Sequence, residues 1–220
     1  MTLSDLTSIV QRLVSNRSYI TSDDIKLALN NAQEQLAVYK YSDRRGRIVE
    51  LHFPELEKTT TESLSANVYS YDFPSTALSV NALHFMYDTS NSKYRELNPQ
   101  DWLQFVSLDV SRDRDPVSWA RRGRKWYITP HPGSDQAGKT ILVTYYDKPA
   151  TLSASGDEPE LPTSFHRCIA YLAGHDLLAE LNDPYSEKIL ALLINKLSNL
   201  QDPESLTAAV GPFHRPSPGV

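Results

Sequence analysis

The hydrophobic periodicity of the chain changes twice, and this change limits the folds that it can adopt. In residues 1–45 apolar side chains recur at helical spacing, as in Leu3, Leu6 and Val10. From residue 46 to 150, short β-branched and aromatic runs alternate with turns, which favours strands. Helical spacing returns over residues 161–202. The pattern therefore predicts helices near both ends and strands between them.

The helical segments carry boundary signals of their own. Thr2 followed by Asp5 predicts a helix cap. A second helix is expected to begin at Thr21 or Ser22 and to end near residues 41–46, YSDRRG. After Pro162, the segment TSFHRCIAYLAGHDLLAEL is apolar on nearly all faces and predicts a buried helix. Asp183 and Pro184 are expected to begin the last helix, with an apolar stripe at Tyr185, Ile189, Leu192, Leu193, Leu197 and Leu200.

The predicted fold class is α+β. Two N-terminal helices are too few for a stable core, so we expect them to join the C-terminal helices in a four-helix bundle. Residues 1–45 and 161–202 would form this bundle, and residues 46–150 an inserted antiparallel β domain. Residues 151–160 are expected to be a linker, and residues 203–220 an extended C-terminal tail rich in proline and glycine.

Inside the β domain, proline and glycine mark the expected element ends. Strands are predicted within residues 47–53, 65–74 and 78–87. Asn98 is expected to cap a short helix with Pro99 at its first position. The stretch VSWARRGRKWYITP predicts a hairpin around Gly123.

The composition excludes several classes of protein. With 220 residues, 40% of them hydrophobic, the chain can bury a sizeable core. Cys168 is the only cysteine, which excludes an intramolecular disulfide and a cysteine-based zinc site and suits a reducing compartment. No apolar run is long enough to predict a membrane span, and the N-terminus lacks the pattern of a signal peptide. The formal net charge of -5 argues against a general nucleic-acid binder.

One stretch spells the phosphate-binding pattern of nucleotide hydrolases. Gly133 is followed, after four residues, by Gly138, Lys139 and Thr140. A working phosphate loop needs a helix to begin at the Lys-Thr end, because the helix N-terminus holds the phosphates. The next residues, ILVTYY at 141–146, are typical of a strand. We therefore interpret the segment as a hairpin between residues 126–129 and this strand, and not as a nucleotide site.

No catalytic or metal-binding group of side chains is predicted. His166 and His175 lie nine residues apart on one expected helix, which is too far for them to share a metal ion. Cys168 lies two residues after His166, so the two side chains point apart and do not form a catalytic pair. Cys168 is expected to be buried instead. The sequence thus predicts no enzyme, no cofactor and no metal.

The densest charge of the chain lies at the tip of the expected hairpin. Arg121, Arg122, Arg124 and Lys125 surround Gly123, flanked by Trp119, Trp126 and Tyr127. This tip is either a contact for phosphates or for an acidic protein surface, or a solvated turn whose charges protect a sheet edge from aggregation. The sequence leaves both interpretations open.

Five stretches, in this order, resemble head-to-tail adaptor (connector) proteins of tailed bacteriophages, including the tail tubular A type of short-tailed phages. They are YSYDFPSTALSVNALHFMY, YRELNPQDWLQF, WARRGRKWYITPHPG, ILVTYYDKPATL and ELPTSFHRCIAYLAGHDLLAEL. The succession of Tyr-x-x-Pro, Tyr-Ile-x-Pro, x-Tyr-Tyr-x-x-Pro and Leu-Pro before a buried helix carries the likeness.

The resemblance implies a structural protein of the virion without catalytic activity. It implies a ring of subunits, usually twelve, that binds the portal protein at the head-tail junction, extends the DNA channel and docks the downstream tail or nozzle protein. Assembly would take place in the host cytoplasm and would involve no membrane. An acidic ring wall would let DNA pass without specific binding.

Six residues are the candidates for partner contact. They are Arg121, Arg122, Arg124 and Lys125 of the hairpin, and Phe213 and Arg215 of the tail. The alternative function is a nucleic-acid-binding module that uses the hairpin tip, residues 121–125.

Overall fold

The computed structural model describes the chain except for residues 16, 18, 43–47, 109–113 and 201–220. The chain divides into two compact units. The first unit comprises Met1–Glu55 and the chain from Pro149 onward, and the second comprises Leu56–Lys148. The first unit is therefore assembled from two pieces of sequence and the second from one. Among the described helices, none has the length and apolar character needed to cross a bilayer.

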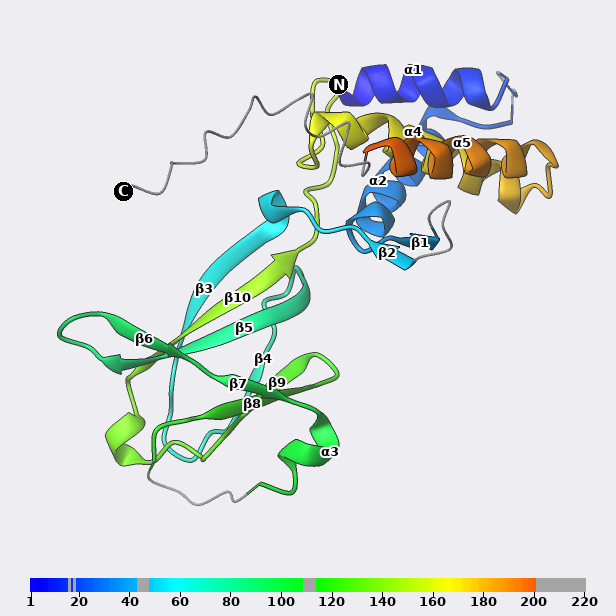
Figure 1. The fold of residues 1–220 in the computed structure, drawn as a ribbon. Coiled ribbons are helices and arrows are strands. Elements are labelled where there is room, and N and C mark those ends of the chain that lie inside the picture. Colours follow the sequence, from blue (N-terminus) through cyan, green and yellow to red (C-terminus); the bar gives the residue numbers. More distant parts are fainter. Residues whose placement is uncertain (16, 18, 43–47, 109–113, 201–220) are drawn as a thin grey trace, which may run out of the picture. The chain divides into compact units, whose positions relative to one another are not determined.

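Four helices make up most of the first unit: α1 (Leu3–Leu13), α2 (Ser22–Ala37), α4 (His166–Glu180) and α5 (Tyr185–Leu200) (Figure 1). Helix α4 is central, because α1, α2 and α5 all pack against it. Its apolar character on nearly all faces explains this position. Gly174 of α4 permits a close approach, since a Cβ atom there would lie only 3.2 Å from Leu13 Cδ1 of α1. A short 3₁₀ turn, η3 (Thr163–Phe165), precedes α4.

The predicted starts of three helices are confirmed by their caps. At α1, Thr2 Oγ1 accepts the Asp5 N–H and the Asp5 carboxylate accepts the Thr2 N–H. Thr21 and Asp24 form the same reciprocal pair at α2. Before α5, the Asp183 carboxylate accepts the Tyr185 N–H at 2.8 Å. Each pair satisfies backbone groups that a helix terminus leaves without an intrahelical partner.

The predicted end of the second helix is wrong. Helix α2 ends at Ala37, and the chain continues into β1 (Lys40–Ser42), which pairs antiparallel with β2 (Ile48–Glu50). Lys40 Nζ lies 2.9 Å from the carboxylate of its cross-strand partner Glu50. Aromatic side chains favour strands over helices, and Tyr39 and Tyr41 stack on each other here with ring centroids 6.4 Å apart.

Helices α1 and α2 bind the segment that leads to α4. The N–H groups of Leu3 and Ser4 donate to the carbonyls of Asp157 and Ser155. The Asn30 side chain of α2 bonds both the N–H and the carbonyl of Leu152, and Gln33 Nε2 donates to the carbonyl of Ala150 at 2.8 Å. The segment expected as a linker over residues 151–160 is thus attached to helices of its own unit.

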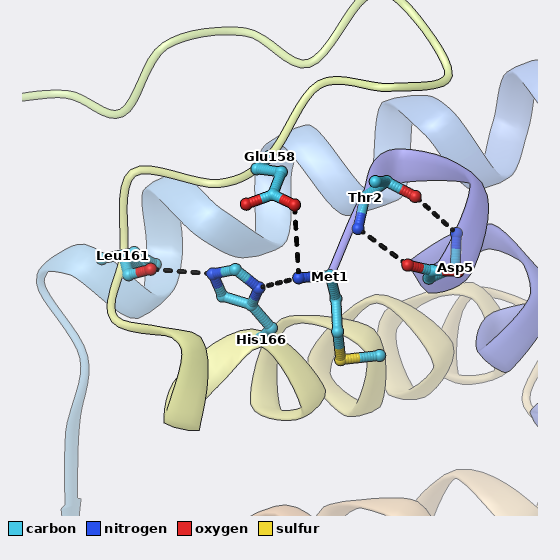
Figure 2. A network of polar contacts seen from close by, with 6 residues as sticks. All are labelled: Met1, Thr2, Asp5, Glu158, Leu161 and His166. Atoms are coloured by element: carbon cyan, nitrogen blue, oxygen red, sulfur yellow. Dashed lines mark hydrogen bonds and ion pairs between the residues drawn. The ribbon is translucent and has the colours of Figure 1, made fainter.

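Figure 2 shows the contacts that join the start of α1 to α4. The amino group of Met1 donates to His166 Nδ1 at 3.1 Å and lies 3.9 Å from the Glu158 carboxylate. His166 Nε2 lies 2.8 Å from the Leu161 carbonyl. Because that carbonyl only accepts, Nε2 carries the proton and Nδ1 accepts from the amino group. Both ring nitrogens of this buried histidine are therefore satisfied.

The second unit contains two four-stranded sheets. The first has the order β3 (Glu57–Ser63), β10 (Thr140–Asp147), β5 (Ala77–Asp88), β6 (Lys93–Glu96), and every neighbouring pair is antiparallel. The second has the order β4 (Ser70–Asp72), β9 (Lys125–Thr129), β8 (Ser118–Arg122), β7 (Asn98–Gln100), with β7 parallel to β8. Helix α3 (Trp102–Phe105) packs against β8. A 3₁₀ turn, η2 (Ser134–Gln136), precedes β10, and another, η1 (Pro54–Leu56), lies where the chain passes from the first unit to the second.

Both sheets of the second unit contribute to one hydrophobic core. Phe85 and Val143 come from the first sheet, and Trp126 and Ile128 from the second. Trp126 is 1% exposed and stacks on Tyr71 with ring centroids 4.4 Å apart. Leu97, fully buried between β6 and β7, lies where the chain passes from one sheet to the other.

The predicted fold class is wrong in its architecture, although a mixed α+β content is consistent with the structure. The helices do not form a four-helix bundle built from the chain ends, because they surround α4 and a fifth helix, α3, lies among the strands. The first unit also has strands of its own, β1 and β2. The β region is not purely antiparallel, because β7 pairs parallel with β8.

Two local predictions in the β region are also wrong. Asn98 and Pro99 belong to β7 and not to a helix, and α3 begins at Trp102. Proline is tolerated on this edge strand because its missing N–H faces away from the ladder. Strands β9 and β10 lie in different sheets and do not form a hairpin. Thr140 nevertheless begins a strand and not a helix, so the structure does not contain the phosphate loop.

Candidate functional site

The hairpin that carries the basic cluster is confirmed. Strands β8 and β9 pair antiparallel, with Arg122 opposite Lys125, so Gly123 and Arg124 form a two-residue turn. Gly123 has a φ of 62°, which suits the first central residue of a type II′ turn. Only glycine adopts this backbone conformation without strain. The local sequence therefore fixes the turn and places four cationic residues around it.

Three of these four cations already have partners. The Arg122 guanidinium lies 4.8 Å above the ring of Trp102. The Arg124 side chain donates to the carbonyls of Pro74 and Ser75 at 3.2 and 3.0 Å. Lys125 Nζ lies 3.2 Å from the carboxylate of Asp72, its cross-strand neighbour on β4. These contacts attach the hairpin tip to helix α3, to the loop after β4 and to β4 itself.

Arg121 differs from the other three. Its side chain is exposed, and within the described part of the chain it has no polar partner. A phosphate that approached the tip would therefore find one uncommitted guanidinium and three cations engaged elsewhere.

An aromatic row continues from the hairpin across the same sheet. Trp102 meets Tyr127 edge to face with ring centroids 4.8 Å apart, and Tyr69 lies 6.1 Å from Tyr127. Tyr69 then stacks on His131 at 4.2 Å. The aromatic row consists of Trp102, Tyr127, Tyr69 and His131, and Arg122 covers its Trp102 end. Sequence analysis did not identify the row, because its members come from α3, β9 and two loops.

Exposed apolar side chains lie beside the row. Leu103 of α3 is 81% exposed and Val106 is 55% exposed, whereas their neighbour Phe105 is buried against the sheet. We call Trp102, Leu103, Val106, Arg122 and Tyr127 the hairpin surface. Aromatic side chains and arginine around exposed apolar groups are the composition enriched in protein interfaces.

The other candidate residues show no catalytic arrangement in the described parts of the chain. Lys139 of the apparent phosphate loop pairs with Asp115 at 3.3 Å and lies over the Phe85 ring. Cys168 is buried as predicted, and burial raises the pKa of its thiol to about 12, so it stays neutral at physiological pH. Among the described residues, no three His, Cys, Asp or Glu side chains gather as a metal site would require. Phe213 and Arg215 lie outside the described residues.

Comparison with known proteins gives one family match. A family model described as SU10 adaptor protein matches residues 1–211, which spans both units of the structure. No curated protein matches the chain.

Proposed function

Because the chain belongs to the SU10 adaptor protein family of phage head-tail adaptors, we propose that it forms a ring beneath the portal of the filled head. The membership makes it a structural adaptor protein of the virion. In the proposal the ring, of twelve subunits, extends the DNA channel and presents a platform on which the tail or nozzle protein docks. That the chain is an adaptor of the tail tubular A type is a narrower prediction than the ring itself.

The observation that carries the proposal is the length of the family match, because it includes every described helix and strand of both units. The charge of the chain supports the channel role. A net charge of -5 gives a ring of many copies a strongly negative wall, and like charge keeps DNA from adhering as it passes.

We assign the hairpin surface to contact with a protein partner, the portal or the tail. The Trp102–Tyr127 pair and the exposed leucine of this surface offer apolar area for such a partner. The alternative, a nucleic-acid-binding module that uses residues 121–125, receives less support because three of its four cations are engaged within the hairpin's own unit.

Electron microscopy of the purified chain mixed with the portal protein of its phage tests the ring. We expect closed rings attached to one face of the portal. Portal particles without added density, at concentrations where both proteins are soluble, would refute the proposal.

Variants of Leu103 test the role of the hairpin surface. Leu103→Asp removes an apolar side chain that is 81% exposed, so the fold should tolerate it. The matched control is Ile48→Asp on β2, where the isoleucine is 80% exposed in the first unit. We expect L103D to weaken binding to the portal or to the tail protein at least tenfold, and I48D to bind both like the wild type. Equal binding by both variants rules out the assigned surface.

A salt titration with duplex DNA separates the two functions. The adaptor proposal predicts little affinity at moderate salt. Tight binding that falls steeply with ionic strength, and that disappears when Arg121, Arg122, Arg124 and Lys125 are replaced, would favour the nucleic-acid-binding module.

A further inference from the structure

Helix α5 presents an apolar stripe that the described residues of its own unit leave uncovered. The helix buries Ser186, Ile189, Leu193 and Leu197. Tyr185 and Leu192, which also belong to the apolar stripe predicted from the sequence, are 43% and 47% exposed. Lys188 lies between them on the same side of the helix, and its Nζ atom is 5.4 Å from the Tyr185 ring. We call Tyr185, Lys188 and Leu192 the α5 stripe.

A groove between α2 and α4 is the second uncovered apolar feature of this unit. Leu27 of α2, Leu177 of α4 and Leu181 just after α4 line it, with Tyr19 at its border. Leu27 is 63% exposed and Tyr19 is 60% exposed. The groove has a volume of about 200 Å³ at this end and continues along both helices to Gln35 and Asp176.

The charges of the two features are complementary. Asp24, Asp176 and Glu180 border the groove, and none of the described residues that line it is positively charged. The α5 stripe carries the ammonium group of Lys188 and no carboxylate. A lysine placed in the groove would face three carboxylates, whereas an acidic stripe would be repelled.

The dimensions of the two features also agree. Tyr185 and Leu192 are seven residues apart, so their side chains leave the helix about 10 Å from each other. Along α2, the groove extends from Asp24 to Gln35, a rise of about 16 Å. Both side chains of the stripe therefore fit within the length of one groove, with Lys188 between them.

We propose that the α5 stripe of one copy of the chain occupies the α2–α4 groove of the next copy. The inference rests on the proposed ring, for which it names the subunit contact. Because the stripe and the groove are different surfaces of the same unit, the contact is head to tail. Repetition of such a contact generates a closed ring when the rotation per subunit allows closure.

A charge exchange across the contact tests the inference. Leu192→Asp places a carboxylate in the acidic groove, and Leu27→Lys places a cation against Lys188, so each single variant should weaken self-association at least tenfold. The double variant L27K/L192D pairs the new charges across every contact and should recover at least half of the lost association free energy. Ile48→Asp, at an 80% exposed position on β2 that belongs to neither the stripe nor the groove, is the matched control and should self-associate like the wild type. Sedimentation and electron microscopy, with and without the portal, measure the assemblies.

The possible results separate this contact from the ring itself. Single variants that bind the portal without closing a ring, together with recovery in the double variant, support the contact. If L192D and L27K both form rings like those of the wild type, the proposed contact is refuted, whereas the proposed ring adaptor is not. A wild type that forms no ring overturns both. Circular dichroism of each variant measures whether its helices are intact. Because L192D changes the stripe and L27K changes the groove, misfolding of one variant leaves the other to test the contact.

Discussion

Replacing Asn30 with alanine should destabilise the first unit by about 1–3 kcal/mol. Asn30 Nδ2 donates to the Leu152 carbonyl at 3.1 Å, and Asn30 Oδ1 accepts the Leu152 N–H at 2.8 Å. Leu152 is 2% exposed, so water replaces these bonds poorly. The estimate is two bonds at about 0.5–1.5 kcal/mol each. Gln33 also loses its bond to Asn30 Oδ1, which places the effect toward the upper end.

The neighbouring Asn31→Ala is the matched control. Asn31 is exposed on the same helix, and the change from asparagine to alanine improves helix propensity by a similar amount at both positions. The difference between N30A and N31A therefore isolates the contacts with Leu152 and Gln33.

Urea denaturation followed with two probes measures the difference. All three tryptophans, Trp102, Trp119 and Trp126, lie in the second unit, so their fluorescence reports that unit. Far-ultraviolet circular dichroism reports mainly the helices of the first. We expect the circular dichroism transition of N30A to move to lower urea than that of N31A. If the unfolding free energies of N30A and N31A agree within about 0.5 kcal/mol, the bonds between Asn30 and Leu152 do not stabilise the first unit as proposed.

Three further predictions concern burial, pH and the second core. Because burial raises the pKa of the Cys168 thiol to about 12, a thiol reagent at pH 8 should react much more slowly with the native protein than with protein unfolded in guanidinium, and equal rates would contradict the burial. Side-chain and backbone hydrogen bonds of Thr21 lower the pKa of Asp24 below its ordinary 3.8, so the stability that this carboxylate contributes is present above that pH and is lost as the pH falls through the lowered pKa. Asp24→Asn should accordingly flatten the decline in urea midpoint as the pH falls below about 4, and an unchanged slope there would count against the cap. Trp126→Ala should cost the second unit about 3–5 kcal/mol, because the side chain is 1% exposed and stacks on Tyr71, and a loss under about 1 kcal/mol in the fluorescence transition would contradict the packing.

Local chemistry explains which elements could be predicted from the sequence. Thr2, Thr21 and Asp183 mark helix starts, because a cap involves residues only two or three positions apart. Strand β3 was missed because all seven of its residues are exposed and polar, so it shows no alternation. Only its pairing with β10, far along the chain, identifies it as a strand. The parallel pairing of β7 with β8 is equally invisible in local composition.

The candidate site likewise contains features that the local sequence predicts and features that only the folded structure reveals. The basic tip around Gly123 follows from turn chemistry and was predicted. The aromatic row was not, because Tyr69, Trp102 and Tyr127 meet only after two loops and a strand are folded together. The engagement of Arg124 with the carbonyls of Pro74 and Ser75 likewise joins residues about 50 positions apart. Charge density alone therefore overstated how many cations the tip offers to a partner.

Cryo-electron microscopy of the head-tail junction, in the virion of the phage that encodes this chain, tests the central claim most directly. We expect the fold of both units to fit a closed ring between the portal and the tail, around the DNA channel. Density of this fold at another place in the virion, or a junction in which the portal meets the tail without it, would contradict the account.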